Sequence, residues 1–356
     1  MNLNFDILVV GAGPAGSTCA AICAQAGLST LIIEKARFPR EKVCGDCINP
    51  GCWPILERLG VAAAMMALPH SKISTVEFID RKGRSIPIPL PPSARGEMAV
   101  KRSLFDQVLL ERAVQSGAEA VQGEVLNAIE ATASGWKVQA GSQTYSGKSL
   151  VAADGRNSTV ARLLGLAPAL VRDRVALQTH IPLPERFKER IVLRQLEGGY
   201  CGIASLGENQ LNVCLVSRPE GIPGLKQWAN GTFAIPSEQN WRTITPLTRA
   251  PLVASHPNLI FAGDAARVVE PFTGEGIYYA LASGELAARH IIAGAATGSQ
   301  SFQKYRAAHA GLYRGRLWIN RLAKEAMLHP FLGDAILTAA RWNPGLLRVL
   351  TTRVLG

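Results

Sequence analysis

The sequence predicts an α/β protein in which pieces of an α/β domain alternate with antiparallel β insertions and are followed by a helical C-terminus. Three observations predict this fold class. Residues 5–35 read as a strand, a glycine-rich turn, a helix and a second strand, which together form a βαβ unit. Residues 71–100 and 166–249 contain β-rich stretches punctuated by Gly and Pro. Residues 301–356 are basic and have helical periodicity.

Length and composition allow one large domain or two moderate ones. The chain has 356 residues, of which 47% are hydrophobic, and this supplies a sizeable core. Seven cysteines are an odd number, and several lie within apolar patterns, which favours a reducing compartment over a disulfide framework. The N-terminus lacks a basic region before an apolar run, so we expect no export signal and a cytoplasmic location. Glycines and a proline interrupt the uncharged stretch 7–33, so we expect no transmembrane helix.

The turn after the first strand carries a glycine pattern with a chemical meaning. Gly11, Gly13 and Gly16 form G-x-G-x-x-G directly before the first helix. The first glycine permits the tight turn, the second lets a pyrophosphate approach the backbone, and the third allows close helix packing. Glu34 ends the second strand, where a carboxylate can accept hydrogen bonds from ribose hydroxyls. Strand, helix and acid in register predict Rossmann-like dinucleotide binding rather than a structural turn.

The remaining elements follow in chain order. Apolar residues recur at helical spacing after residue 101, and Gly117 ends this helix. A β-meander then leads to a buried strand at 149–153, and a long helix is expected at 276–293. We therefore divide the chain into an α/β domain, a β domain for substrate and a basic helical segment. The α/β domain comprises residues 1–70, 101–165 and 250–300. The β domain comprises residues 71–100 and 166–249, and the basic helical segment comprises residues 301–356.

Two later strand ends carry Gly and Asp together. They are Asp154-Gly155 in VAADGRNSTVAR and Gly263-Asp264 in IFAGDAARVVEPFTGEGI. With GAGPAG and Arg102 in KRSLFDQVLL, these motifs resemble in type and order the FAD-dependent family that includes para-hydroxybenzoate hydroxylase-type aromatic hydroxylases and geranylgeranyl reductases. The resemblance implies a Rossmann-like FAD-binding domain interleaved with an antiparallel substrate sheet.

The resemblance also implies which residues hold the cofactor. Asp264 would bind a ribityl hydroxyl, Arg102 would meet the phosphate or ribityl region, and amides at the Gly274 helix entry would favour the negative charge of reduced flavin. The candidate cofactor-binding residues are Gly11, Gly13, Pro14, Ala15, Gly16, Glu34, Lys35, Arg40, Cys44, Gly45, Arg102, Val125, Asp154, Gly155, Gly263, Asp264, Pro271, Gly274, Glu275, Gly276 and Ile277.

The segment EKVCGDCINP places Cys44 and Cys47 two residues apart, with Cys52 nearby. A metal site needs about four ligands, which this segment does not supply, so no metal is expected. A thioredoxin-like redox pair should open a helix, whereas this segment reads as a loop, so a redox pair is also disfavoured. REKVCGD is similar to the loop that lies beside the flavin in geranylgeranyl reductases. In that interpretation Cys44 is either a proton donor or a small residue filling a tight loop. Our candidate catalytic residues are Cys44, Lys42 and Tyr200.

The resemblance leaves several activities open. The aromatic Y-x-W-x-F-P stretch of geranylgeranyl reductases reads GYCGIAS here, which favours hydroxylation of a hydrophobic small molecule over reduction of alkene bonds in an isoprenoid lipid. Halogenases share the scaffold and use a lysine, for which Lys42 is the candidate, but their W-x-W-x-I-P signature is absent. A flavin-binding membrane-associated protein without turnover is a further alternative. A second G-x-G-x-x-G is also absent, so NAD(P)H would bind transiently, or a separate flavin reductase would deliver electrons.

The C-terminal segment suggests a partner. Of the net charge of +11, residues 301–356 contribute nine Lys or Arg against Glu325 and Asp334. Such a segment could lie on an anionic membrane, dock an acidic partner, or close the core with a solvated basic face. No nucleic-acid-binding module accompanies the charge, so nucleic acid is not expected.

Overall fold

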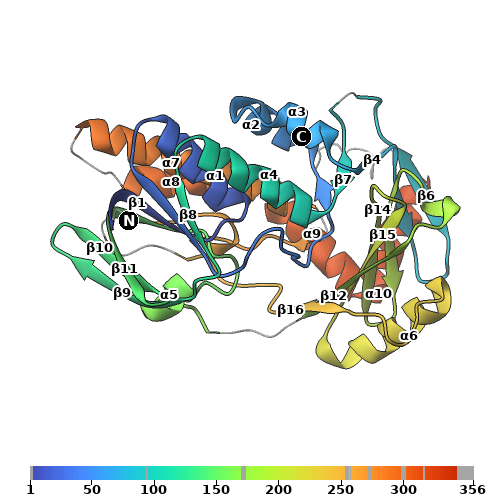
Figure 1. Ribbon diagram of the computed structural model, residues 1–356. Helices are drawn as coiled ribbons and strands as arrows, with labels where there is room; N and C mark the ends of the chain where they lie inside the picture. Colours follow the sequence, from blue (N-terminus) through green and yellow to red (C-terminus); the bar gives the residue numbers. More distant parts are fainter. Residues whose placement is uncertain are drawn as a thin grey trace.

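The computed structural model describes residues 3–93, 95–169, 174–252, 256, 258–271, 274–297, 302–315 and 317–342. Residues 272 and 273 of the PFTGEGI motif and the tail 343–356 lie outside the described residues. Two large sheets lie side by side along the molecule, with a small sheet between them and helices over the first (Figure 1). This confirms the α/β fold class that the sequence predicts.

The first sheet has the order β8-β2-β1-β11-β10-β9 among the described residues, and β17 also pairs with β11. Its strands are β1 (Asn4–Val10), β2 (Thr30–Glu34), β8 (Glu119–Gln122), β9 (Leu126–Thr132), β10 (Gly135–Ala140), β11 (Gln143–Ala152) and β17 (Leu259–Phe261). β8, β2, β1, β11 and β17 run parallel, whereas β10 joins β9 and β11 antiparallel. β2 is buried throughout because both faces of the sheet are covered, which explains its continuous apolar run.

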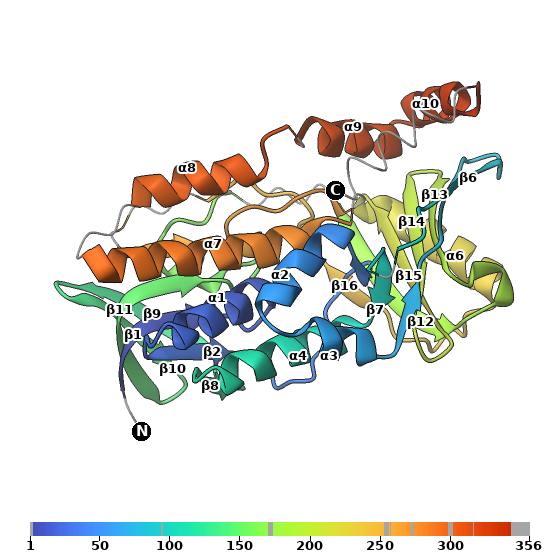
Figure 2. The same ribbon diagram turned by 90° about the horizontal axis from the view of Figure 1, so that it is seen from above.

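Three helices cover one face of the first sheet, namely α1 (Pro14–Gln25), α4 (Arg102–Gln115) and α7 (Gly276–Thr297). α7 lies directly against α1, since a side chain at Gly284 would overlap the backbone of Ala15. Trp136 and Val138 of β10 contribute to the core on the other face, beside α5 (Thr159–Leu163). The first sheet therefore has a core on each side, and the carboxyl ends of its parallel strands point toward the second sheet (Figure 2).

The second sheet has the order β16-β12-β15-β14-β13-β5-β6 among the described residues. Its strands are β5 (Thr75–Ile79), β6 (Ser85–Pro89), β12 (Val175–Pro182), β13 (Arg190–Leu196), β14 (Gly199–Ser205), β15 (Gln210–Ser217) and β16 (Arg242–Ile244). The prediction of an antiparallel sheet is corrected at one pair, because β5 and β13 run parallel. These two strands come from separate passes of the chain, so no tight turn forces them to be antiparallel. α6 (Ile222–Phe233) packs on this sheet, and η2 (Glu185–Phe187) and η3 (Pro219–Gly221) are short connections.

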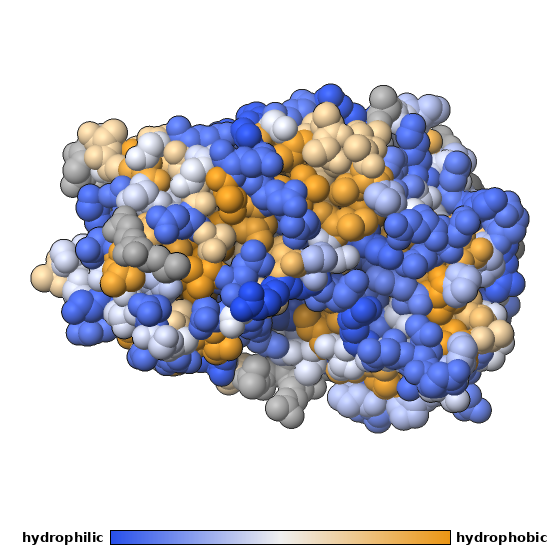
Figure 3. All heavy atoms as spheres, viewed as in Figure 1, coloured by the Kyte–Doolittle hydropathy of each residue, from blue (hydrophilic) through white to orange (hydrophobic). Residues whose placement is uncertain are grey.

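A small three-stranded sheet lies between the two large ones. It has the order β3-β7-β4, formed by β3 (Cys47–Ile48), β7 (Met98–Val100) and β4 (His70–Lys72). The intervening chain forms η1 (Pro50–Cys52), α2 (Trp53–Arg58) and α3 (Ala62–Ala67). Figure 3 shows apolar side chains gathered over α2 and α3 on this face, where Ala63, Ala64 and Ala67 are exposed.

The C-terminal helices are α8 (Phe302–Leu312), α9 (Leu317–Leu328) and α10 (Pro330–Trp342). α8 runs along α7, and α9 and α10 continue past it to lie over the second sheet (Figure 2). Asp334 of α10 forms an ion pair with Arg81, which follows β5 closely in sequence, and Asp334 Oδ2 lies 2.6 Å from Arg81 Nη2. Among the described residues, no helix is both long and apolar enough to cross a bilayer.

Candidate active site

The glycine turn between β1 and α1 has the geometry that its sequence predicts. Gly11 has a φ of +101°, and a side chain there would lie 2.5 Å from the carbonyl oxygen of Ala153. A side chain at Gly16 would overlap the carbonyl oxygen of Gly11. Gly13 faces open space, where the nearest atom to an added methyl group would be Arg40 Nη2, at 3.5 Å. Gly11 and Gly16 thus shape the turn, and Gly13 leaves room above it.

Glu34 closes the turn from β2. Its Oε2 accepts a 2.8 Å hydrogen bond from the Ala12 amide, and its Oε1 accepts one of 2.9 Å from Ala36. The carboxylate is buried and ends β2, where the sequence predicts it, and its contact with a ribose stays a prediction. Lys35 is exposed beside it, and Val125 is 57% exposed in a loop whose amides bond the Glu34 carbonyl. Cofactor contacts of Lys35 and Val125 stay predictions.

A buried carboxylate that the sequence did not single out organises two predicted arginines. Asp106 of α4 accepts two 2.8 Å hydrogen bonds from Arg102 and forms an ion pair of 3.1 Å with Arg40. Its side chain is fully buried. Burial alone would lower the pKa of Arg102, but Asp106 and the Cys44 side chain hold that pKa above its ordinary value. The arrangement fixes two positive charges beside the open face of Gly13.

The two Gly-Asp strand ends meet at the carboxyl edge of the first sheet, and their acids have different partners. Asp154 Oδ2 accepts the amides of Thr159 and Val160 at 2.6 and 3.0 Å, so this carboxylate caps α5. Asp264, in η4 (Gly263–Ala265), lies 3.3 Å from Arg156 Nη2. Burial opposes its ionisation, but Arg156 and nearby cations hold the pKa of Asp264 below its usual value. Asp264 is therefore an ionised acceptor facing the cavity.

The helix entry after Pro271 presents backbone rather than side chains to the cavity. Pro271, Gly274, Gly276 and Ile277 line the cavity, and no atom lies within 4 Å of where a side chain at either glycine would be. The neighbouring Glu275 is buried and turned away from it. Its carboxylate accepts hydrogen bonds from Tyr279 at 3.3 Å and from Asn320 of α9 at 3.2 Å. Glu275 thus ties the C-terminal helices to the start of α7, and its contact with the cofactor stays a prediction.

One cavity of about 300 Å³ joins these motifs to the second sheet. On the side of the first sheet it is lined by the glycine turn, Gly155, Gly263 and Asp264. On the other side it is lined mainly by apolar residues of the second sheet and by the inner faces of α9 and α10. These include Val76, Phe78, Ala176, Ile191, Leu193, Ile203, Val216, Ile244, Leu247, Leu322, Ala326 and Ile336. The site is therefore polar at one end and apolar at the other.

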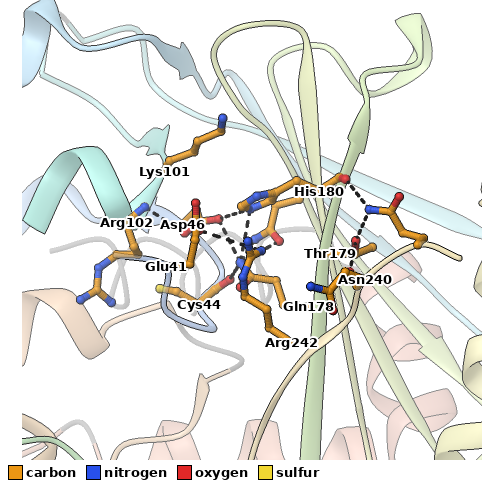
Figure 4. A network of polar contacts seen from close by, with 12 residues as sticks. Glu41, Cys44, Asp46, Lys101, Arg102, Gln178, Thr179, His180, Asn240 and Arg242 are labelled. Carbon is orange, nitrogen blue, oxygen red and sulfur yellow. Dashed lines mark hydrogen bonds and ion pairs between the residues drawn. The ribbon is translucent and has the colours of Figure 1, made fainter. Parts of the chain in front are cut away.

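The loop 42–47 crosses between the two halves of this cavity, and a polar network fixes it (Figure 4). Gln178 and Asn212 of the second sheet donate to the carbonyl oxygen of Cys44 at 2.7 and 2.9 Å. Asp46, with a φ of +58°, lies 2.9 Å from His180 Nε2 and also accepts from Gln178. Burial raises the pKa of Asp46, although its contact with His180 opposes the rise. The second sheet thus holds the loop against the first.

The three predicted catalytic residues line the cavity, together with Gly45. Burial and the charge of Arg102 lower the pKa of Lys42 to about 8. Tyr200 is 3.5 Å from Glu270, whose carboxylate forms a double ion pair with the buried Arg174 at 2.9 and 2.8 Å. Burial raises the pKa of Tyr200 well above its usual value, so its phenol stays protonated.

The cysteines of the loop are free thiols, and Cys44 and Cys47 both line the cavity. Among the described residues, no cluster of three or more His, Cys, Asp or Glu side chains is arranged to hold a metal ion. The spacing of the two cysteines therefore places two small sulfur-bearing side chains beside the cavity.

Comparison with known proteins decides which cofactor this cavity takes. Residues 4–181 match the family model described as FAD binding domain. The chain belongs to this FAD-binding family. It is 31% identical over 328 residues to a menaquinone reductase of Mycolicibacterium smegmatis, covering 83% of this chain and 78% of that one. It is 28% identical over 326 residues to a digeranylgeranylglycerophospholipid reductase of Methanopyrus kandleri, covering 80% of each.

The fold agrees with this assignment. The chain is similar to a geranylgeranyl bacteriochlorophyll reductase-like protein of Thermoplasma acidophilum, with a TM-score of 0.76 and 24% identity over 92% of this chain and 89% of that one. The resemblance drawn from the motifs is confirmed, and the flavoprotein is an FAD-dependent oxidoreductase.

The residues present in the flavoprotein fit FAD. A methyl group added at Gly45, Gly155, Gly274 or Gly276 would meet no atom within 4 Å, so the backbone borders open space at four places around the cavity. Arg156, which lines the cavity, also has a buried Nε without a hydrogen-bond partner among the described residues. Both features suit a large ligand rich in phosphate, hydroxyl and carbonyl groups.

Proposed function

We propose that this flavoprotein reduces carbon–carbon double bonds in the prenyl chain of a hydrophobic lipid or quinone. The observation that carries the proposal is the continuous cavity, whose polar end carries the cofactor motifs and whose other end is lined by apolar side chains. The names of the relatives, a menaquinone reductase and a digeranylgeranylglycerophospholipid reductase, support the same substrate class. Bound FAD supplies the two-electron chemistry.

Different residues of the chain would then hold the cofactor, supply protons and bind the substrate. Arg40 and Arg102 would hold the pyrophosphate, Asp264 would hold a ribityl hydroxyl, and the amides at Gly274 would hold the ring system. The half-buried Lys42 adds a positive charge at the cofactor end while its amine is protonated, which holds below a pH of about 8. Cys44 and Tyr200 are the candidate proton donors to a double bond, because both line the cavity. The apolar residues around them exclude water and hold the chain of the substrate.

NAD(P)H is the proposed reductant, bound transiently at the open cavity. The sequence carries a single G-x-G-x-x-G, and this supports either transient binding or delivery of electrons by a separate flavin reductase. Hydroxylation remains the second candidate function, because the GYCGIAS strand lacks the aromatic signature of geranylgeranyl reductases.

Anaerobic turnover tests the proposed function. The yellow holoenzyme is bleached with NADPH or NADH in separate samples, and a short-chain prenylated quinone is then added. We expect the flavin colour to return with the quinone, and the product to have gained two hydrogen atoms by mass. This gain should remain after ferricyanide reoxidises any quinol to the quinone, because a saturated chain bond is not reoxidised. A product that forms only with oxygen and gains an oxygen atom would establish hydroxylation instead. Bleaching by dithionite but by neither nicotinamide would point to a partner reductase.

We also propose that helices α9 and α10 contact an anionic membrane. Trp318, Phe331 and Leu332 are 47%, 87% and 38% exposed on these helices, and the C-terminal segment is strongly basic. The inner faces of the same helices line the cavity, which would let a lipid pass between the bilayer and the site. An acidic protein partner for this segment is an alternative outcome.

Vesicle binding tests the membrane contact. Phe331→Ser with Leu332→Ser should weaken binding to vesicles containing phosphatidylglycerol by about tenfold or more, because two large side chains lose apolar burial. The matched control is Val114→Ser on α4, which removes an apolar side chain that is 48% exposed elsewhere on the surface. Equal sedimentation of both variants with vesicles would contradict the proposal.

A further inference from the structure

Glu97 is a buried carboxyl group inside the apolar half of the cavity. It directly precedes β7, is 7% exposed, and lines the cavity together with Cys47, Phe78 and Ile191. The surrounding wall is otherwise made largely of aliphatic side chains from the second sheet. A carboxyl group in such surroundings needs an explanation, because burying an ionisable group without a partner is costly.

No protein group compensates Glu97 among the described residues. Its Oε2 atom is buried without a hydrogen-bond partner, and no described Lys or Arg forms an ion pair with it. The titratable side chains affected by its charge are the thiols of Cys47 on β3 and Cys52 on η1, which are uncharged. Neither thiol can neutralise a carboxylate.

Burial therefore keeps the carboxyl group protonated. It raises the pKa of Glu97 to about 8, and no charged group among the described residues opposes the shift. At neutral pH the side chain is a neutral acid that carries a hydroxyl proton and faces the cavity. A carboxylic acid kept neutral by an apolar site can serve as a hydrogen-bond donor. Its missing acceptor must then come from what fills the cavity.

We infer that Glu97 donates a hydrogen bond to an oxygen atom of the substrate, so the apolar half of the cavity is built for a ligand that carries a carbonyl, ether or hydroxyl oxygen. This deepens the proposed function and rests on it, since a prenylated quinone or an ether lipid has such an oxygen and a pure hydrocarbon does not. Tyr200, the other hydroxyl-bearing side chain on this wall, already has Glu270 as a partner. Glu97 thus selects the head group while the aliphatic wall holds the chain.

Binding measurements on the holoenzyme test this inference without relying on turnover. The probes are a short-chain prenylated naphthoquinone and the naphthalene that carries the same chain without oxygens. Their dissociation constants are measured from the change in flavin absorbance at pH 6.5 and pH 9. We expect the wild type to prefer the quinone by about tenfold at pH 6.5, the usual contribution of one buried hydrogen bond. The preference should shrink at pH 9, where the carboxylate can no longer donate.

Two substitutions assign the effect to Glu97. Glu97→Leu should abolish the preference for the quinone and leave hydrocarbon binding at least as tight. Glu97→Gln retains a donor, so it should keep much of the preference but lose its pH dependence. Lys42, whose pKa is also about 8, lines the same cavity, so a pH dependence that persists in Glu97→Gln would belong to Lys42. Tyr200→Phe is the control and should retain the pH dependence, because the Tyr200 phenol does not ionise in this range.

The inference is overturned if Glu97→Leu, folded as judged by its melting temperature and flavin content, still prefers the quinone as the wild type does. Its failure can be told apart from failure of the proposed function. A holoenzyme that discriminates between the probes through Glu97 but reduces neither a quinone nor a prenyl lipid would refute the reductase activity alone.

Discussion

Replacing Asp106 with leucine should lower the free energy of unfolding of the apoprotein by about 3–5 kcal/mol, which is typical when one partner of a buried ion pair is removed. Asp106 is fully buried and is paired with both Arg102 and Arg40. Without it, two guanidinium groups would remain in the interior with no counter-charge. Urea unfolding of the apoprotein measures the loss.

Glu111→Leu is the matched control for Asp106→Leu. Glu111 lies on the same helix but is exposed, so its replacement should change the free energy of unfolding by no more than about 0.5 kcal/mol. Adding FAD should narrow the gap between the two variants, because the pyrophosphate would supply negative charge to the same arginines. Equal urea midpoints for the two apoproteins would show that Asp106 does not hold the arginines in place.

Gly13→Ala and Gly16→Ala should fail in different ways, although they are three residues apart. At Gly16 the added methyl group overlaps the Gly11 carbonyl oxygen, so the apoprotein should lose about 1–3 kcal/mol of stability through overpacking. At Gly13 the methyl group fits the apoprotein, where the nearest atom is at 3.5 Å, but occupies space proposed for the pyrophosphate. Gly13→Ala should therefore keep apoprotein stability and lose about tenfold to a hundredfold in FAD affinity.

Urea unfolding and flavin fluorescence titration separate these two outcomes. Gly224→Ala is the control, since Gly224 is exposed in α6 with no atom near the added methyl group. It should leave FAD affinity unchanged and stabilise the helix slightly. If Gly13→Ala binds FAD as tightly as the control does, the pyrophosphate does not lie over Gly13.

The sequence was sufficient to predict those parts of the site that depend on local pattern. A glycine turn has its own spacing, and Gly-Asp at a strand end indicates a carboxyl edge, so the positions of Gly11, Gly13 and Asp264 in the fold could be predicted without coordinates. The parallel pairing of β5 with β13 could not be predicted, since it joins residues more than a hundred positions apart and no turn links them.

Other residues were missed because their roles depend on distant partners. In sequence, Asp106 is one acid on an amphipathic helix, and only the fold brings Arg40 to it. Glu97 looks like a loop carboxylate until β3, β5 and β13 enclose it. The protein partners of Asp154 and Glu275 were missed as well: the first carboxylate caps α5 and the second bonds Asn320, while their contacts with the cofactor stay predictions.

The order in which the chain visits its two large sheets limits how the enzyme could be re-engineered. It builds β1 and β2 of the first sheet, β5 and β6 of the second, returns for β8 to β11, leaves for β12 to β16, and comes back for β17. No single cut can therefore release an intact substrate module for exchange with that of a relative. A change of specificity would have to be introduced by substituting individual side chains. During synthesis, the ribosome must reach β17 before the first sheet and its cofactor-binding edge can be complete.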